Sequence, residues 1–117
     1  MEIRQIKELL DAELIVGEDT LDNDVHSACG SDMMSDVLAY VKDQAVLLTG
    51  LVNAQVIRTA QMMDMICIVF VRSKRPSDDM IELAREAGIT VMTTSKRMYE
   101  ACGLLYAAGL GKGATHE

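Results

Sequence analysis

The chain has 117 residues, half of them hydrophobic, and its 18 acidic and 11 basic residues give a formal net charge of −7. This length suits one domain with a single core, and the hydrophobic content is too high for a disordered chain. The acidic balance disfavours nucleic acid and anionic membranes as partners, because both require clustered lysine and arginine. Since tryptophan is absent and only three tyrosines and one phenylalanine occur, a platform for stacking bases is not expected.

The sequence also indicates the compartment. It contains no run of about 18 apolar residues that could span a membrane, and its N-terminus, MEIRQIKELL, lacks the apolar core of a signal peptide. Its three cysteines lie far apart and form no CxxC pair, so neither a disulfide framework nor a zinc site is indicated. We therefore expect a cytoplasmic protein with no bound metal and no cofactor.

The first third of the chain predicts a helix, two strands and a second helix. Apolar residues of segment 3–12 recur at helical spacing, which is typical of an amphipathic helix. A strand at 13–16, an acidic loop at 17–24, a strand at 25–29 and a helix near 32–42 are expected to follow. Ser31 or Asp32 would cap that helix.

The rest of the chain repeats one pattern three times. Apolar runs at 45–50, 66–72 and 89–94 are each followed by an amphipathic segment, at 53–64, 78–88 and 95–110. Apolar strands that alternate with such helices indicate a parallel sheet covered on both faces. The predicted fold class is α/β, a three-layer α/β/α sandwich with a mainly parallel sheet of about five strands. Residues 1–110 would form the single domain and 111–117 a flexible C-terminal tail.

Parallel strands end at one edge of their sheet, which is the usual ligand edge of an open α/β fold. The loops there would be 49–53, 72–77 and 93–96, and they hold the densest basic cluster of an acidic chain. Hydroxyls, a glycine and cations in these loops suit a phosphate or carboxylate. The candidate ligand-binding residues are Thr49, Gly50, Arg72, Ser73, Lys74, Thr93, Thr94 and Ser95.

The same residues also fit a purely structural interpretation. Ser77, and either Thr94 or Ser95, are suitable N-caps for the helices that follow them. Asp78 and Asp79 could pair with the basic residues in place of a ligand. Both interpretations remain open at the level of the sequence.

No catalytic motif is recognisable. The segment GLGKG (109–113) follows a helix and lacks the spacing and the Ser or Thr of a phosphate-binding loop. His26 and Asp32 are the candidates for a titratable catalytic residue, but His26 has no plausible catalytic partner nearby in the sequence, and the chain offers no recognisable nucleophile–base pair. The chain is therefore not expected to be an enzyme.

The chain contains nine methionines. Met62, Met63 and Met65 cannot all face the core of one helix end, so at least one of them should be exposed or lie at a subunit contact. We expect a homodimer.

Much of the chain resembles the DRTGG domain family. The similar stretches are GSDMMSDVLAY (30–40), AVLLTGLVNAQVIRTAQMMD (45–64) and IVFVRSKRPSDDMIELAREAGITVMTTSKRMYEACGLL (68–105). The string that names the family is absent, and Ser73 and Lys74 stand where many members carry two glycines. The resemblance implies a fold similar to the N-terminal domain of HPr kinase/phosphorylase. It does not imply kinase activity, since the similarity does not include a nucleotide-binding catalytic domain.

Such domains occur as regulatory segments of phosphotransacetylases and CBS-domain pyrophosphatases, so the resemblance implies a regulatory role. The leading hypothesis is a non-catalytic regulatory or ligand-sensing module that binds a small anionic metabolite or nucleotide at the C-terminal ends of its parallel strands. The alternative is a protein-interaction adaptor without a small-molecule ligand. The sensing module would signal through a homodimer or a partner surface, whereas the adaptor would use its methionine-rich surface to contact a larger metabolic enzyme.

Overall fold

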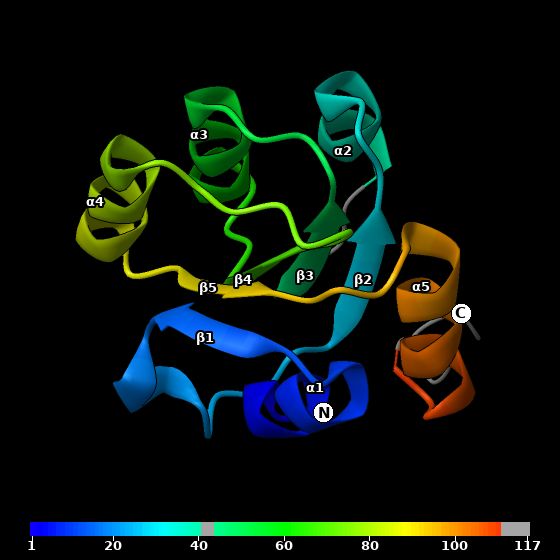
Figure 1. The fold of residues 1–117 in the computed structure, drawn as a ribbon. Coiled ribbons are helices and arrows are strands. Elements are labelled where there is room, and N and C mark those ends of the chain that lie inside the picture. Colours follow the sequence, from blue (N-terminus) through cyan, green and yellow to red (C-terminus); the bar gives the residue numbers. More distant parts are fainter. Residues whose placement is uncertain (41–43, 111–117) are drawn as a thin grey trace.

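The computed structural model describes residues 1–40 and 44–110; the predicted tail at 111–117 and the last residues of the predicted helix 32–42 lie outside this range. The second strand begins later than predicted, and the last helix is shorter at both ends. The elements are α1 (Ile3–Leu10), β1 (Glu13–Val16), a 3-10 turn η1 (Glu18–Thr20), β2 (Ser27–Gly30), α2 (Met34–Tyr40), β3 (Ala45–Thr49), α3 (Ala54–Met62), β4 (Cys67–Phe70), α4 (Asp78–Ala87), β5 (Thr90–Thr93) and α5 (Met98–Ala107) (Figure 1).

The five strands form one mixed sheet in the order β1-β5-β4-β3-β2. Strands β2 to β5 are mutually parallel, and β1 joins β5 in the antiparallel direction. Every residue of β3, β4 and β5 is buried, which explains why these strands are apolar without alternation. The predicted α/β fold with a mainly parallel sheet of five strands is confirmed.

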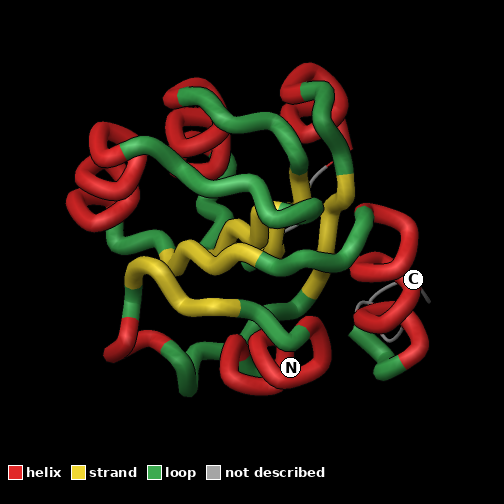
Figure 2. The backbone as a smooth tube through the Cα atoms, viewed as in Figure 1, coloured by secondary structure: helices red, strands yellow, loops and turns green. Residues whose placement is uncertain are grey.

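Helices cover both faces of the sheet, as Figures 1 and 2 show. Strands β2 to β5 follow one another in a single direction across the sheet, so right-handed crossovers place α2, α3 and α4 on the same face. Helices α1 and α5 cover the other face. Alternate residues of β4 enter separate cores: Ile68 and Phe70 pack with α3 and α4, whereas Cys67 and Val69 pack with α1 and α5.

The ends of three parallel strands lie level with one another. Thr49 pairs with Phe70, and Phe70 pairs with Thr93. The loops that follow β3, β4 and β5 therefore emerge along one edge, which we call the strand-end rim (residues 49–53, 72–77 and 93–96). The order of the parallel strands contains no reversal, so this rim is not the switch-point crevice of a doubly wound sheet.

Several local signals act as the sequence predicts. The side chains of Asn53 and Ser77 accept hydrogen bonds from the backbone at the starts of α3 and α4, and Gly88 ends α4 with a left-handed φ of 72°. Met62 is 68 % exposed, whereas Met65 is buried, so the methionine cluster divides as expected. Within the described ranges, no helix combines the length and the apolar character that a membrane span requires.

Candidate functional site

The turn after β4 holds two consecutive residues in the left-handed region. Arg72 and Ser73 have φ values of 58° and 59°, which is unfavourable for residues other than glycine. The turn closes through the Lys74 N–H, which donates to the Val71 carbonyl at 3.1 Å. The N–H groups of Arg72 and Ser73 each donate at 2.8 Å to carbonyls of segment 94–96. The backbone is therefore held in a strained shape that exposes the side chains of Arg72, Ser73 and Lys74.

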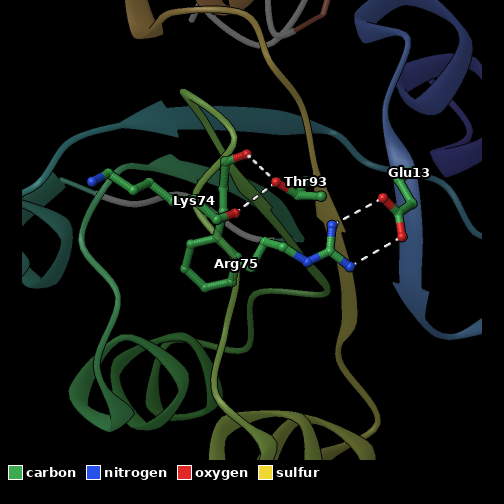
Figure 3. A network of polar contacts seen from close by, with 5 residues as sticks. Glu13, Lys74, Arg75 and Thr93 are labelled. Carbon is green, nitrogen blue, oxygen red and sulfur yellow. Dashed lines mark hydrogen bonds and ion pairs between the residues drawn. The ribbon is translucent and has the colours of Figure 1, made fainter.

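The threonines predicted to contact a ligand are buried and already hydrogen-bonded. Thr93 Oγ1 donates to the Lys74 carbonyl at 2.6 Å (Figure 3). Thr94 Oγ1 donates to the carbonyl of Leu10 at 2.7 Å, which ties the rim to the end of α1. Thr49 Oγ1 donates to Asp32 at 3.0 Å. These hydroxyls build the rim, and a direct role for them in ligand contact remains a prediction.

Arg75 forms an ion pair with Glu13, the first residue of strand β1. Its guanidinium donates to both carboxylate oxygens of Glu13, at 2.9 and 3.1 Å (Figure 3). The hydrogen bond and the charge of Arg75 lower the pKa of Glu13, and Glu13 raises the pKa of Arg75. The sequence left open whether Arg75 pairs with the acidic start of α4. In the structure, Arg75 instead pairs with Glu13 of β1.

Arg72 and Lys74 are in a different situation. Figure 3 shows the Lys74 side chain directed away from the Arg75–Glu13 pair. Among residues 1–40 and 44–110, neither side chain makes a hydrogen bond or an ion pair. Two exposed cations at the rim are therefore available to an external anion.

Asp32 approaches the same loops from the end of β2. The sequence suggested that it caps the helix after it, but its carboxylate Oδ1 instead accepts the Gly50 N–H at 2.6 Å and the Thr49 hydroxyl at 3.0 Å. The pKa of Asp32 is lowered chiefly by the Gly50 hydrogen bond, with Thr49 and the charge of Arg72 acting the same way against partial desolvation. The Gly50 N–H, predicted to face a ligand, is thus occupied by a carboxylate of the chain itself.

The Arg72 guanidinium lies against the backbone of Gly50. A Cβ added at Gly50 would come within 3.0 Å of Arg72 Cζ, and closer still to one terminal nitrogen. Because Gly50 is not among the glycines with positive φ, its role is to leave space rather than to adopt a special conformation. Asp32, Thr49, Gly50 and Arg72 therefore form one cluster from the loops of three neighbouring strands.

Two further candidates make no contact within this cluster that the structure shows. Ser95 is exposed after β5, between the two residues whose carbonyls accept the N–H groups of Ser73 and Arg72. His26, one of two candidates for catalysis, precedes β2 and therefore lies at the opposite edge of the sheet, where its N–H donates to the Gln44 carbonyl. Among the residues that the structure describes, no three His, Cys, Asp or Glu side chains are placed to hold a metal ion.

Sequence reasoning missed the position of Asp32 at the ligand edge. The available signal was its place two residues after β2, which is equivalent to the rim loops after β3 to β5. The error came from the predicted end of that strand. A strand that ends at residue 29 makes Asp32 a natural N-cap of the next helix. Once β2 extends to Gly30, pairing with Leu48 brings Asp32 beside the next strand-end loop.

A search of curated proteins found no match. The crystal structure of the CBS and DRTGG domains of the regulatory region of Clostridium perfringens pyrophosphatase, complexed with the activator diadenosine tetraphosphate, is similar with a TM-score of 0.72 and 18 % identity. The match covers 89 % of this chain and 45 % of that chain, so this chain corresponds to less than half of the solved region. The DRTGG domain family model matches residues 5–108, and the chain therefore belongs to the DRTGG domain family.

Proposed function

We propose that this domain is a non-catalytic regulatory module that senses a small anionic metabolite or nucleotide at its strand-end rim. The observation that carries the proposal is the pair of exposed cations, Arg72 and Lys74, on a strained and firmly held turn. Backbone strain is retained where the surrounding structure enforces it, and such positions cluster at functional sites. The presence of a DRTGG domain in the regulatory region of a pyrophosphatase solved with a nucleotide activator supports a sensing role.

A thermal-shift screen tests the proposal, with inorganic phosphate, acetyl phosphate, AMP and ATP as probes. A ligand that binds only the folded state stabilises it by about 1.4 kcal/mol at ten times its Kd, which raises the Tm of a domain of this size by several degrees. We expect Arg72→Ala and Lys74→Ala to abolish the shift without unfolding the protein.

Arg75→Ala is the matched control, because it removes an equal charge from the same loop. Its guanidinium is engaged by Glu13, so the shift should persist in this variant. A shift of full size in the Arg72→Ala/Lys74→Ala double variant would contradict the site.

The alternative function, an interaction adaptor, is favoured by a separate observation. Large apolar side chains are exposed on three helices: Met33 and Leu38 at α2, Met62 on α3, and Tyr99 and Tyr106 on α5. Helices α2 and α5 lie on opposite faces of the sheet beside its edge strand β2 (Figure 1). A homodimer or a complex with a larger metabolic enzyme that meets this edge of the sheet would cover exposed apolar side chains of α2 and α5. Light scattering after size-exclusion chromatography tests the homodimer, and a monomer at high concentration counts against it.

A further inference from the structure

Asp32 and Arg72 are neighbours on the strand-end rim but do not form an ion pair. The charge of Arg72 reaches Asp32 and helps to lower its pKa, yet the ion pairs between described residues do not include these two. The Gly50 N–H and the Thr49 hydroxyl both end on Oδ1, and the backbone N–H of Leu51 also lowers the pKa of this carboxyl group. An ionised carboxylate offers about four lone-pair sites, so Asp32 retains capacity as an acceptor. The rim therefore presents an exposed acceptor beside an exposed cationic donor.

This combination discriminates between classes of anion. Inorganic phosphate is attracted by Arg72 and Lys74 but repelled by the Asp32 carboxylate, so part of the attraction is cancelled. A ligand that carries a hydroxyl group next to its phosphate gains an attraction to Asp32 that offsets this repulsion. It donates a charge-assisted hydrogen bond to Asp32, and such O–H···O⁻ bonds are stronger than neutral ones.

We infer that the ligand of the strand-end rim is a phosphate ester with free hydroxyl groups, as in the ribose of a nucleotide, whose hydroxyls bind Asp32 and whose phosphate binds Arg72 and Lys74. The inference rests on the proposed function and adds the chemical class of the ligand. A carboxylate that holds ribose hydroxyls beyond the end of a parallel strand is an established solution in other α/β sheets. Here Asp32 is pre-positioned for that task by Gly50 and Thr49.

Isothermal titration calorimetry with AMP and with 2′,3′-dideoxy-AMP tests the inference, since the two probes differ only in the ribose hydroxyls. The wild type should bind AMP at least ten-fold more tightly than the dideoxy analogue. Asp32→Asn should weaken AMP binding to the level of the analogue. It should leave binding of the analogue unchanged or tighter, because a repulsive charge has been removed.

Two further variants separate charge from position. Asp36→Asn removes a negative charge from the exposed first turn of α2 and should retain the preference for AMP. Gly50→Ala displaces the Arg72 guanidinium without altering any charge, and should weaken both nucleotides to a similar extent. Circular dichroism of each variant confirms that it is folded, and the comparison of the two nucleotides in the wild type requires no variant at all.

The outcomes distinguish the two levels of the proposal. Equal affinity of the wild type for AMP and the dideoxy analogue, with loss of both in Arg72→Ala, would overturn the role of Asp32 and leave the anion site in place. If inorganic phosphate or acetyl phosphate binds as tightly as AMP, the role of Asp32 would likewise be overturned and the anion site would remain. Failure of all these probes to bind the wild type would overturn the site and the ligand class together.

Discussion

The carboxylate of Asp32, two residues beyond β2, lies 2.6 Å from the backbone nitrogen of Gly50, the first residue after β3. The same oxygen accepts the hydroxyl of Thr49. Edge strand β2 is thus joined to its neighbour by a side chain beyond the last ladder pair, Gly30 with Leu48. One carboxylate both closes the end of the sheet and supplies the negative group of the candidate site.

Substitution of Asp32 should therefore lower stability in a graded manner. We expect Asp32→Ala to cost about 1–2 kcal/mol of unfolding free energy, near the lower range for hydrogen bonds to a charged group, because the residue is exposed. Asp32→Asn should cost less, since an amide oxygen still accepts from Gly50. Urea denaturation measures both, and Asp36→Asn serves as the control for loss of a charge alone.

The pH dependence of this effect has a defined sign. The pKa of Asp32 is lower in the folded protein than its ordinary value, first because of the Gly50 hydrogen bond. Its contribution to stability is therefore complete above the unfolded pKa of about 3.9 and is lost as the pH falls through the folded pKa. The difference between wild type and Asp32→Asn should be constant from about pH 5 to pH 8 and should shrink below about pH 4. A difference that grows on acidification would contradict the assignment.

The sequence predicts the fold better than it predicts the site. Apolar strands such as Cys67–Phe70, separated by capped helices, determine the parallel sheet and its two covered faces, because burial and capping act locally. The partners of individual polar groups depend on the register between strands. Thr93 and Thr94 are predicted correctly at the rim, but only the packed structure shows that their hydroxyls reach the carbonyls of Lys74 and Leu10.

The partner of Arg75 also depends on strand pairing, because β1 joins the sheet in the antiparallel direction beside β5. In the sequence, Arg75 belongs to one basic cluster with Arg72 and Lys74. In the fold, β1 lies beside β5 and brings Glu13 to Arg75 across 62 positions of the chain. Contacts of that separation carry no local sequence signal, so the division of the cluster into an engaged arginine and two available cations could not be predicted.

Thr94→Val tests the structural role of a candidate ligand residue. The Thr94 hydroxyl is buried and donates to the Leu10 carbonyl at 2.7 Å. Its removal leaves a buried acceptor unsatisfied, which should cost about 1–3 kcal/mol of unfolding free energy. Chemical denaturation measures this loss. Ser95→Ala, at the neighbouring exposed position, should be nearly neutral, and ligand binding by folded Thr94→Val should be unchanged. Loss of binding in folded Thr94→Val would instead assign the hydroxyl to the ligand.

Ser73→Gly should stabilise the protein. Ser73 has a φ of 59°, and the left-handed region costs about 1–2 kcal/mol for a residue with a Cβ. The greater entropy of glycine in the unfolded chain offsets about 0.5–1 kcal/mol of this gain. The net increase in unfolding free energy should reach up to about 1.5 kcal/mol in urea titrations. Ser95→Gly is the matched control, because Ser95 is exposed but is not among the residues with positive φ; it should destabilise. Destabilisation of equal size at both serines would show that the turn is not strained.

Gly30→Ala should destabilise the contact between β2 and α5. A Cβ at Gly30 would lie 2.5 Å from Cys102 Sγ and 3.3 Å from Met98 Sδ. Crowding of this kind in a packed region costs about 1–3 kcal/mol. Truncation of the thiol in Cys102→Ala should create the missing space, so the double variant should be more stable than the sum of the single changes predicts.

Unfolding free energies of the wild type, both single variants and the double variant measure this coupling directly. Gly103→Ala is the control on the same helix, because nothing lies within 4 Å of a Cβ at that position. Alanine there should stabilise α5 by up to about 1 kcal/mol through its higher helix propensity. Additive effects of Gly30→Ala and Cys102→Ala would contradict the predicted collision, since two side chains that compete for one space cannot act independently.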